Sequence, residues 1–528
     1  MTRLHRLVAL MLLLALGPGR PAPGGPVGGG TVTWALHVPI DRLDPSASFS
    51  LATGMAVGRN IFDRLVEHDD QLNIRPGLAL SWTPSRDGRV WTFRLRQGVR
   101  FHDGTPFNAD AVVFNVTRAI NPQLRLPAGS FAWAGVKGAR KVDEYTVELT
   151  GDQPLAALLN NIADSGLGAI ISPQALQRAR DPRDFAPVGT GPFKFVSWQP
   201  DGDLVLEAHR DHWGGPPTID RLIVRASPTP STRVAQLEGG EVDLITQVPI
   251  QEIQRLGAMR GIEVAVKPAT SWTYIAMNTR KPAFADAQVR RALNHLVDKQ
   301  TIIDKVVFGV GRPADSPIGS AYRAHKSVKV YQYDPGLARQ LLDQAGWRVG
   351  SDGVRQKDGQ RLAGTLWVPV GRFAGGAAMA QVIASAFRGV GVDVRVQEVE
   401  FGFYLAEARR GPEESRIEMV MAGWGTADPD TGLRPVLHSQ SWPPRGNNIA
   451  FYRNPQVDEL LDRGAATMDP AARTAVYHRV QELVMEDAPW LFLTERREAV
   501  AWRSYVRGIR FIPSSAGLID VRGVSAVR

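Results

Sequence analysis

The sequence predicts an α/β fold with more than one lobe. Strand-like and helix-like patterns alternate along most of the chain. The 528 residues leave room for several domains at roughly 100–200 residues each. Hydrophobic residues make up 44% and charged residues 22%, as in an ordinary globular protein, so a disordered or fibrous chain is excluded.

The first clear elements are a strand and the helix that follows it. Residues 90–95 alternate, which places Trp91, Phe93 and Leu95 on one side of a half-buried strand. Asn108 is a good N-cap for the helix, since its side chain can accept a hydrogen bond from the first turn. An apolar helical face follows, formed by Val112, Val113, Val116 and Ile120.

Later segments repeat this alternation. A helix begins at Pro230 and is stopped by the Gly239-Gly240 pair, and another begins with Asp334 as N-cap and Pro335 as first helical residue. We expect further helices at 377–387, 454–464 and 470–486, and strands at 222–224, 242–245, 365–370, 392–396, 491–494 and 506–511.

Charge and cysteine content exclude several classes of function. The 62 Lys and Arg against 53 Asp and Glu give a net charge of +9, but no long basic run carries the excess, so we expect no nucleic-acid partner. Cysteine is absent, which excludes disulfides, cysteine-ligated zinc, iron–sulfur clusters and a lipid-modified N-terminal Cys.

The N-terminus predicts export. Arg3 and Arg6 precede an unbroken apolar run at 7–16, which is too short to cross a bilayer because a spanning helix needs about 20 residues. A basic lead with a short apolar run is typical of a secretory signal peptide, which we place at 1–24. A Gly/Pro-rich tether follows at 25–30.

Motifs for catalysis or resident cofactors are missing from the sequence. It contains no P-loop, no Gly-x-Ser-x-Gly elbow and no His-Glu-x-x-His. His209 and His212 could form a metal pair, but we interpret them as polar turn residues before Trp213-Gly214-Gly215. We therefore expect a protein that is not an enzyme and that holds no metal and no cofactor.

Aromatic residues in turns suggest a ligand cleft. Trp133, Trp272, Tyr274 and Trp424 lie in short turn-like segments, and Trp424 stands between two glycines. Such rings supply contact area together with a polar edge, which suits the wall of a binding cleft.

Several stretches resemble one protein family, the extracytoplasmic solute-binding proteins of peptide-type ABC importers (solute-binding protein family 5, peptide/nickel group). The resemblance extends from about residue 31 to the end. It is carried by 61–69, 75–82, the long block 87–107, the Gly189-Thr190-Gly191-Pro192-Phe193 turn and His212-Trp213-Gly214.

The resemblance implies a two-lobed periplasmic binding protein of the large three-domain type, with a hinge and a ligand cleft between the lobes. Lobe I would comprise 31–75, 185–280 and 489–528. An extra domain at 76–184 would pack on lobe I, and lobe II would comprise 281–488.

The implied function is capture of a peptide or similar small polar solute by hinge closure, in the periplasm. The solute would pass to ABC permease subunits in the membrane, which work with separate ATPase subunits, and the binding protein would be a monomer. Two alternatives stay open: a metal-chelate or opine-type solute of the same family, and an extracytoplasmic enzyme or chaperone on the same scaffold.

The resemblance also points to site residues. Peptide-binding relatives hold the free amine with an Asp that follows a Gly-Trp strand end. Here Trp424 matches the Trp, Ala427 stands at the usual Asp position, and Asp428 comes one residue later. Arg372 lies near the position of a carboxylate-binding Arg. We predict ligand contacts at Trp424, Asp428 and Arg372, and cleft walls at Tyr274, Trp272 and Trp133.

Overall fold

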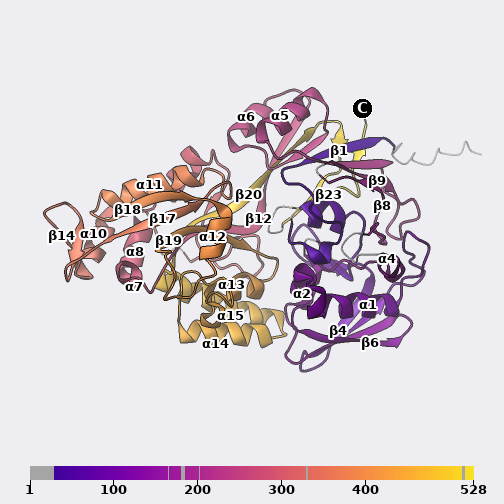
Figure 1. Cartoon of the computed structure of the whole chain (residues 1–528), viewed down its shortest axis with the longest axis horizontal. Helices are drawn as coiled ribbons and strands as arrows, with labels where there is room; N and C mark the ends of the chain where they lie inside the picture. Colours follow the sequence, from indigo (N-terminus) through magenta and orange to yellow (C-terminus); the bar gives the residue numbers. More distant parts are fainter. Residues whose placement is uncertain are drawn as a thin grey trace, which may run out of the picture.

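The computed structural model describes residues 29–527, except 51, 165, 180–184, 201, 329–330 and 514–517. The chain forms two lobes, and strands β12 (Ile262–Met277) and β20 (Trp490–Arg503) run from one lobe to the other (Figure 1). The predicted signal peptide and most of the tether lie outside the described residues. Within the described part, no helix has the length and apolar character needed to cross a membrane.

A large mixed sheet passes through both lobes. Besides β12 and β20 it contains β1 (Thr31–Leu36), β8 (Phe193–Trp198), β9 (Asp203–Ala208), β10 (Arg221–Ala226), β11 (Leu244–Thr246), β13 (Arg312–Pro313), β17 (Ala363–Pro369), β18 (Asp393–Val399) and β19 (Met419–Gly425). Its order is β18-β17-β19-β12-β20-β11-β1-β10-β9-β8, with β13 paired to β20. The neighbours of β1 and of β17 are parallel to them, and β12 is antiparallel to both β19 and β20.

The first lobe carries a smaller antiparallel sheet of order β4-β5-β7-β6, against which helix α1 packs. The bounds are β4 (Ala79–Pro84), β5 (Val90–Leu95), β6 (Val136–Asp143), β7 (Thr146–Gly151) and α1 (Ala109–Ile120). The other elements of this half are β2 (Val66–His68), β3 (Ile74–Pro76), α2 (Pro127–Ala132), α3 (Leu158–Ala163), α4 (Pro173–Arg178), α5 (Pro230–Gly239) and α6 (Ile253–Gly257).

Helices cover both faces of the sheet in the second lobe, because the side chains of its strands alternate between two cores. Trp490 and Phe492 of β20 belong to one core, and Leu491 and Leu493 to the other. The helices are α7 (Pro282–Ala285), α8 (Ala287–His295), α9 (Lys299–Thr301), α10 (Pro335–Gln344), α11 (Gly376–Arg388), α12 (Phe401–Glu407), α13 (Pro429–Leu437), α14 (Pro455–Ala466) and α15 (Pro470–Asp487).

Local sequence rules account for many of these boundaries. The predicted strand at 90–95 is β5, and the Asn108 side chain accepts a hydrogen bond from Ala111 N at 3.2 Å to cap α1. Asp334 caps α10 in the same way, accepting from Leu337 N at 2.8 Å. Predictions based on a capping residue and an apolar period were therefore confirmed to within a few residues.

Two strand predictions near the C-terminus were wrong in length. The strand expected at 491–494 is the longer β20, because its charged middle, Glu495 to Glu498, stays paired with β12 and β13. The strand expected at 506–511 is divided into β21 (Val506–Arg507) and β22 (Arg510–Ile512), since Gly508 lies between them with φ of +80°. β21 pairs with β24 (Ser525–Ala526) and β22 with β23 (Leu518–Asp520).

The remaining strands form a small sheet at the edge of the second lobe: β14 (Arg348–Val349), β15 (Arg355–Lys357) and β16 (Gln360–Arg361). The domain limits near 75, 184, 280 and 488 stay a prediction, because β12 and β20 contribute to the sheet of both lobes.

Candidate ligand-binding site

A cavity of about 730 Å³ lies between the two lobes. Its volume falls in the range of roughly 300–1,000 Å³ that is usual for small-molecule sites. The first lobe contributes Phe49, Ser50, Gly54, Phe131, Asp164 and Leu167. The other wall is formed by Ser271, Trp272, Thr273, Arg372, Phe373, Gly423, Trp424, Gly425, Thr426, Arg434, Pro435, Ser441, Arg445, Gly446, Asn447 and Arg496.

Two of the predicted tryptophans stand next to each other on this wall. Trp272 of β12 is paired directly with Trp424 of β19, so their side chains share one face of the sheet. Trp424 is half-buried, and its indole Nε1 donates a hydrogen bond to Thr431 O at 3.0 Å. Trp272 is 3% exposed and packs edge-on against Tyr322 with 5.9 Å between ring centroids. Both rings are thus fixed before any ligand arrives.

Glycine allows β12 and β19 to approach closely at the cavity. A Cβ atom at Gly425 would lie 2.5 Å from the Cα of Ser271, its partner across the strands. Because no side chain fits there, the glycine after Trp424 has a steric role in the wall.

The wall from the second lobe is rich in arginine. Arg434 is neutralised by Asp430, with Nε 3.1 Å from the carboxylate, and Arg496 lies 2.8 Å from Glu498. Within the described part of the chain, the guanidinium groups of Arg372 and Arg445 make no hydrogen bond and no ion pair. Two guanidinium groups at the cavity wall therefore have no carboxylate partner among the described residues.

Arg372 also has an unfavourable electrostatic environment. Burial lowers the pKa of its guanidinium, and the neighbouring positive charge of Arg496 lowers this pKa further. The aromatic ring of Phe401 lies 5.8 Å from the guanidinium carbon. An anion bound in the cavity would relieve both effects, since it would supply the missing negative charge.

The first lobe contributes apolar area and an acidic group. Phe49 is 57% exposed and meets Phe131 edge-on, with 5.9 Å between ring centroids. Asp164 is a buried carboxylate on the same wall. The cavity therefore combines aromatic surface, arginines on one side and an acidic residue on the other.

Asp428 does not lie on the cavity wall, contrary to the expectation from sequence. It is fully buried, and Arg473 of α15 donates two hydrogen bonds of 2.8 and 2.7 Å to its carboxylate. It also caps α13 by accepting from Asp430 N at 2.8 Å. The ion pair with Arg473 helps to hold the pKa of Asp428 below its usual value, against the effect of burial. A carboxylate engaged in this way is not available to a ligand ammonium group.

The other two predicted wall residues also lie in protein cores. Tyr274 is 2% exposed and stacks on Trp490 with 4.1 Å between ring centroids, and its burial raises the pKa of the phenol. Trp133 is 2% exposed and packs in the core of the small sheet. Of the six predicted residues, the structure brings Trp272, Trp424 and Arg372 together at the cavity and places the other three elsewhere.

Direct contacts join the two lobes beside the cavity. Asn160 of α3 donates a hydrogen bond of 2.8 Å to Asp428 at the start of α13. His68 Nε2 lies 3.2 Å from the amide oxygen of the same Asn160. Elsewhere, Arg323 donates a 2.8 Å hydrogen bond to Asn73. The walls of the cavity are therefore held against each other in this structure.

The two histidines considered as a metal pair are engaged with the protein. His209 Nδ1 is 3.1 Å from Gly191 O, and His212 Nε2 is 3.3 Å from Asp63. Trp213 Nε1 also donates to Asp63 at 2.7 Å, so His212 and Trp213 bind the same buried carboxylate.

Sequence reasoning missed several residues of the site, including Phe49, Phe131, Asp164, Arg445 and Arg496. Each lies in a different segment, and no local pattern marks it. The pairing of β12 with β19 is the feature that could have linked Trp272 to Trp424. Arg445 lies in a loop after a 3₁₀ turn, so no strand pairing indicates its neighbours.

Comparison with known proteins identifies the family. Residues 73–444 match the bacterial extracellular solute-binding proteins, family 5 (middle region). The glutathione-binding protein GsiB of Salmonella typhimurium is 30% identical over 494 residues, covering 93% of each chain.

Solved structures agree with this assignment. The periplasmic binding protein DppA from Helicobacter pylori, in complex with the peptide STSA, is 28% identical with a TM-score of 0.75, covering 95% of this chain and 99% of its own. NikA from Brucella suis, in complex with Fe(III)-EDTA, is 27% identical with a TM-score of 0.82, covering 94% and 100%. Proteins of this family bind solutes for transport. The present chain belongs to the bacterial extracellular solute-binding proteins of family 5, and it is the substrate-binding subunit of an ABC importer.

Proposed function

We propose that this chain captures a short anionic peptide of the glutathione type and delivers it to the importer. The observation that carries the proposal is the pair Arg372 and Arg445, which line the cavity and whose guanidinium groups make no hydrogen bond or ion pair in the described part of the chain. Glutathione has two carboxylates and one ammonium group at neutral pH. The similarity to GsiB, which is named for glutathione binding, supports this class of ligand.

The proposed contacts follow from the two walls. Arg372 and Arg445 would each bind one carboxylate, because a charge-assisted hydrogen bond is stronger than one between neutral groups. Trp272 and Trp424 would pack against the peptide backbone. A ligand that touches both walls would favour the closed arrangement of the lobes.

The proposed location, oligomeric state and transport partners are inferred from the family. We place the mature protein in the periplasm as a monomer, since family members are extracellular binding proteins and the N-terminus resembles a signal peptide. ABC permease subunits in the membrane would receive the solute, and separate ATPase subunits would supply energy. The chain itself would catalyse no reaction.

Isothermal titration calorimetry tests the ligand class. Glutathione should bind, and Arg372→Gln should weaken it by about 10- to 100-fold, as for the loss of one charged hydrogen bond. Arg348→Gln, a surface variant at a side chain that is 71% exposed, should leave the affinity unchanged. Unchanged affinity in Arg372→Gln, or no heat from glutathione and from other acidic tripeptides, would contradict the proposal.

A metal chelate is the second candidate, because the same two arginines would also suit a polycarboxylate complex. The similarity to NikA with Fe(III)-EDTA favours it. Native mass spectrometry of the purified protein separates the two ligands. A retained mass without metal supports the peptide, and a retained mass that contains metal supports the chelate.

A further inference from the structure

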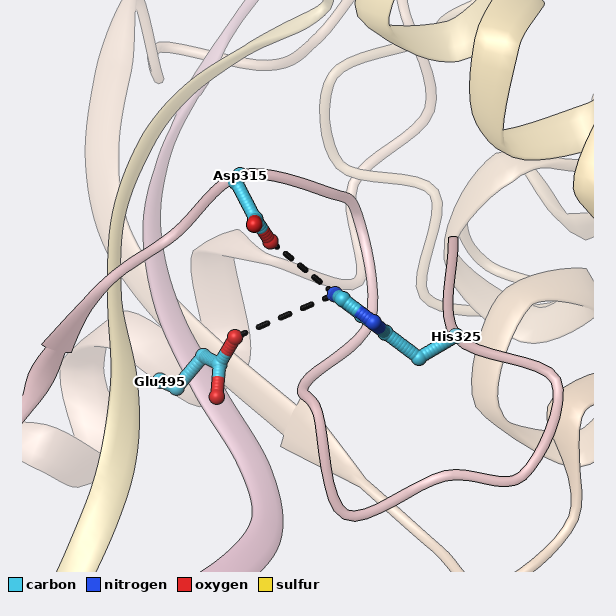
Figure 2. Close-up of side chains that lie close together, drawn as sticks. All are labelled: Asp315, His325 and Glu495. Carbon is cyan, nitrogen blue, oxygen red and sulfur yellow. Dashed lines mark hydrogen bonds and ion pairs between the residues drawn. The ribbon is translucent and has the colours of Figure 1, made fainter. Parts of the chain in front are cut away.

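A second polar site lies outside the cavity, where the chain after β13 folds over β20. Asp315 and His325 come from this segment, and Glu495 comes from β20 (Figure 2). Arg312 of β13 is paired with Glu495 across the strands, which fixes the start of the segment against β20. None of the three residues lines the interlobe cavity.

The three side chains converge on one point. His325 Nε2 lies 2.9 Å from Asp315 Oδ1 and 4.0 Å from Glu495 Oε1, as the dashed lines in Figure 2 indicate. One ligand atom from each residue lies within 4.8 Å of the others. The side chains are only 7–15% exposed, so the point is shielded from solvent.

Serine hydroxyl groups orient both carboxylates. Ser327 Oγ donates to Asp315 Oδ2 at 2.6 Å, and Ser320 Oγ donates to Glu495 Oε2 at 2.5 Å. These bonds occupy the outer oxygens and leave the inner ones directed at His325. Second-shell hydrogen bonds of this kind hold carboxylate ligands in metal sites.

Glu495 Oε1 gives an independent indication of a ligand. Glu495 is 5% exposed, and among the described residues no donor forms a hydrogen bond with this buried oxygen. A buried polar atom without a hydrogen bond is costly, and it is uncommon in native proteins. A positive ion at the centre of the cluster would satisfy it.

In this structure the guanidinium group of Arg312 supplies positive charge to the two carboxylates. Its guanidinium lies 3.2 Å from Asp315 Oδ2 and 3.5 Å from Glu495 Oε1. The Arg312 side chain is 44% exposed, so it can move into solvent while the carboxylates stay in place. An incoming metal ion would thus have to displace one flexible cation.

We propose that Asp315, His325 and Glu495 form a binding site for a divalent transition metal. One imidazole nitrogen and two carboxylate oxygens are a donor set that suits zinc and its neighbours, and water would complete the coordination. The metal would hold the segment after β13 against β20, because its ligands come from both.

Calorimetry with ZnCl₂ on chelator-treated full-length protein tests the site. The wild type should bind about one zinc ion per chain. His325→Gln and Glu495→Gln should each weaken binding by about tenfold or more, because each removes a ligand. His295→Gln is the matched control, since His295 lies away from the cluster with Nδ1 2.8 Å from Gln332 O. It should bind zinc like the wild type.

Arg312→Gln distinguishes a metal site from an internal ion-pair cluster. Removal of the competing cation should tighten zinc binding by about threefold or more. Zinc should also raise the melting temperature of the wild type more than that of His325→Gln. No zinc binding by the wild type, equal affinity in His325→Gln, or unchanged or weaker affinity in Arg312→Gln would overturn the proposal. If Glu495→Gln does not fold, the zinc affinities of His325→Gln and Arg312→Gln test the proposed site.

Discussion

Arg445 lies in a loop of the second lobe, exposed to the cavity between the lobes. A guanidinium in this position attracts anions, but solvent screens it more than it screens a buried group. Arg445→Gln should therefore weaken glutathione binding less than Arg372→Gln and should reduce its dependence on salt. Calorimetry at two NaCl concentrations measures both effects. Equal salt dependence in wild type and variant would exclude a direct role for Arg445.

Asp428 is predicted to matter for stability. Asp428→Asn leaves Arg473 buried without its counter-ion, which costs about 3–5 kcal/mol when one partner of a buried pair is lost. Urea unfolding of the single variant measures this cost. The double variant Asp428→Asn/Arg473→Met should recover part of it, because no buried charge then remains unpaired. A single variant as stable as the wild type would contradict the assignment.

His102 makes stability depend on pH. Its Nε2 lies 2.9 Å from Gly191 O and its Nδ1 accepts from Gly189 N at 3.4 Å, which fits a neutral ring. Burial lowers the pKa of His102 from 6.5 to about 4. Between these values the unfolded chain binds a proton that the folded chain does not, so stability falls as the pH decreases through this window.

The magnitude can be measured with a single variant. A decrease in pKa of the size given for His102 corresponds to roughly 3 kcal/mol of unfolding free energy. His102→Gln should therefore lose less unfolding free energy than the wild type between pH 7 and pH 4.5, as measured by urea unfolding. His295→Gln should behave like the wild type. An equal loss in His102→Gln would show that the neutral ring does not carry this effect.

Site residues differ in how far the sequence could locate them. The sequence predicts turns around Trp272 and Trp424, but both lie on strands, β12 and β19, and the pairing of these strands places both rings at the cavity. The sequence predicts Asp428 as a ligand contact because it follows a Gly-Trp strand end, but its partner Arg473 is 45 residues away on α15. No local rule signals that ion pair, and it decides whether the carboxylate is available.

At the scale of elements, α3 and the start of α13 form a contact between the lobes. The bond from Asn160 to Asp428 exists only when the lobes touch, so Asn160→Ala should favour the open arrangement. A lost hydrogen bond of about 1 kcal/mol would weaken glutathione binding by about fivefold. Calorimetry measures the affinity, and thermal unfolding should change little.

Gln153→Ala is the control for this contact, since Gln153 is exposed on the first lobe. It should bind glutathione like the wild type. Tighter or unchanged binding by Asn160→Ala would show that the α3–α13 contact does not contribute to closure.

Helices were easier to predict than strands because caps and apolar periods are local. Asp469 accepts from Ala472 N at 2.7 Å and begins α15 at the predicted residue. The middle of β20 is charged and gives no strand pattern, and it is a strand only because β12 and β13 supply backbone partners from distant parts of the sequence.

For the whole molecule, the fold class and the family were predictable from long motifs, whereas the cavity was not. The cavity is formed by segments from both lobes, and its volume and charge depend on how the lobes meet across β12 and β20 (Figure 1). A ligand that contacts both walls stabilises this arrangement by its difference in affinity for the closed and open forms.

Small-angle X-ray scattering tests this closure most directly. Ligand-free protein is compared with protein saturated by whichever of glutathione or metal chelate binds in calorimetry. We predict that the bound solute lowers the radius of gyration, because the two lobes close around it. Superimposable scattering curves for free and saturated protein, at concentrations where calorimetry shows full binding, would contradict the account.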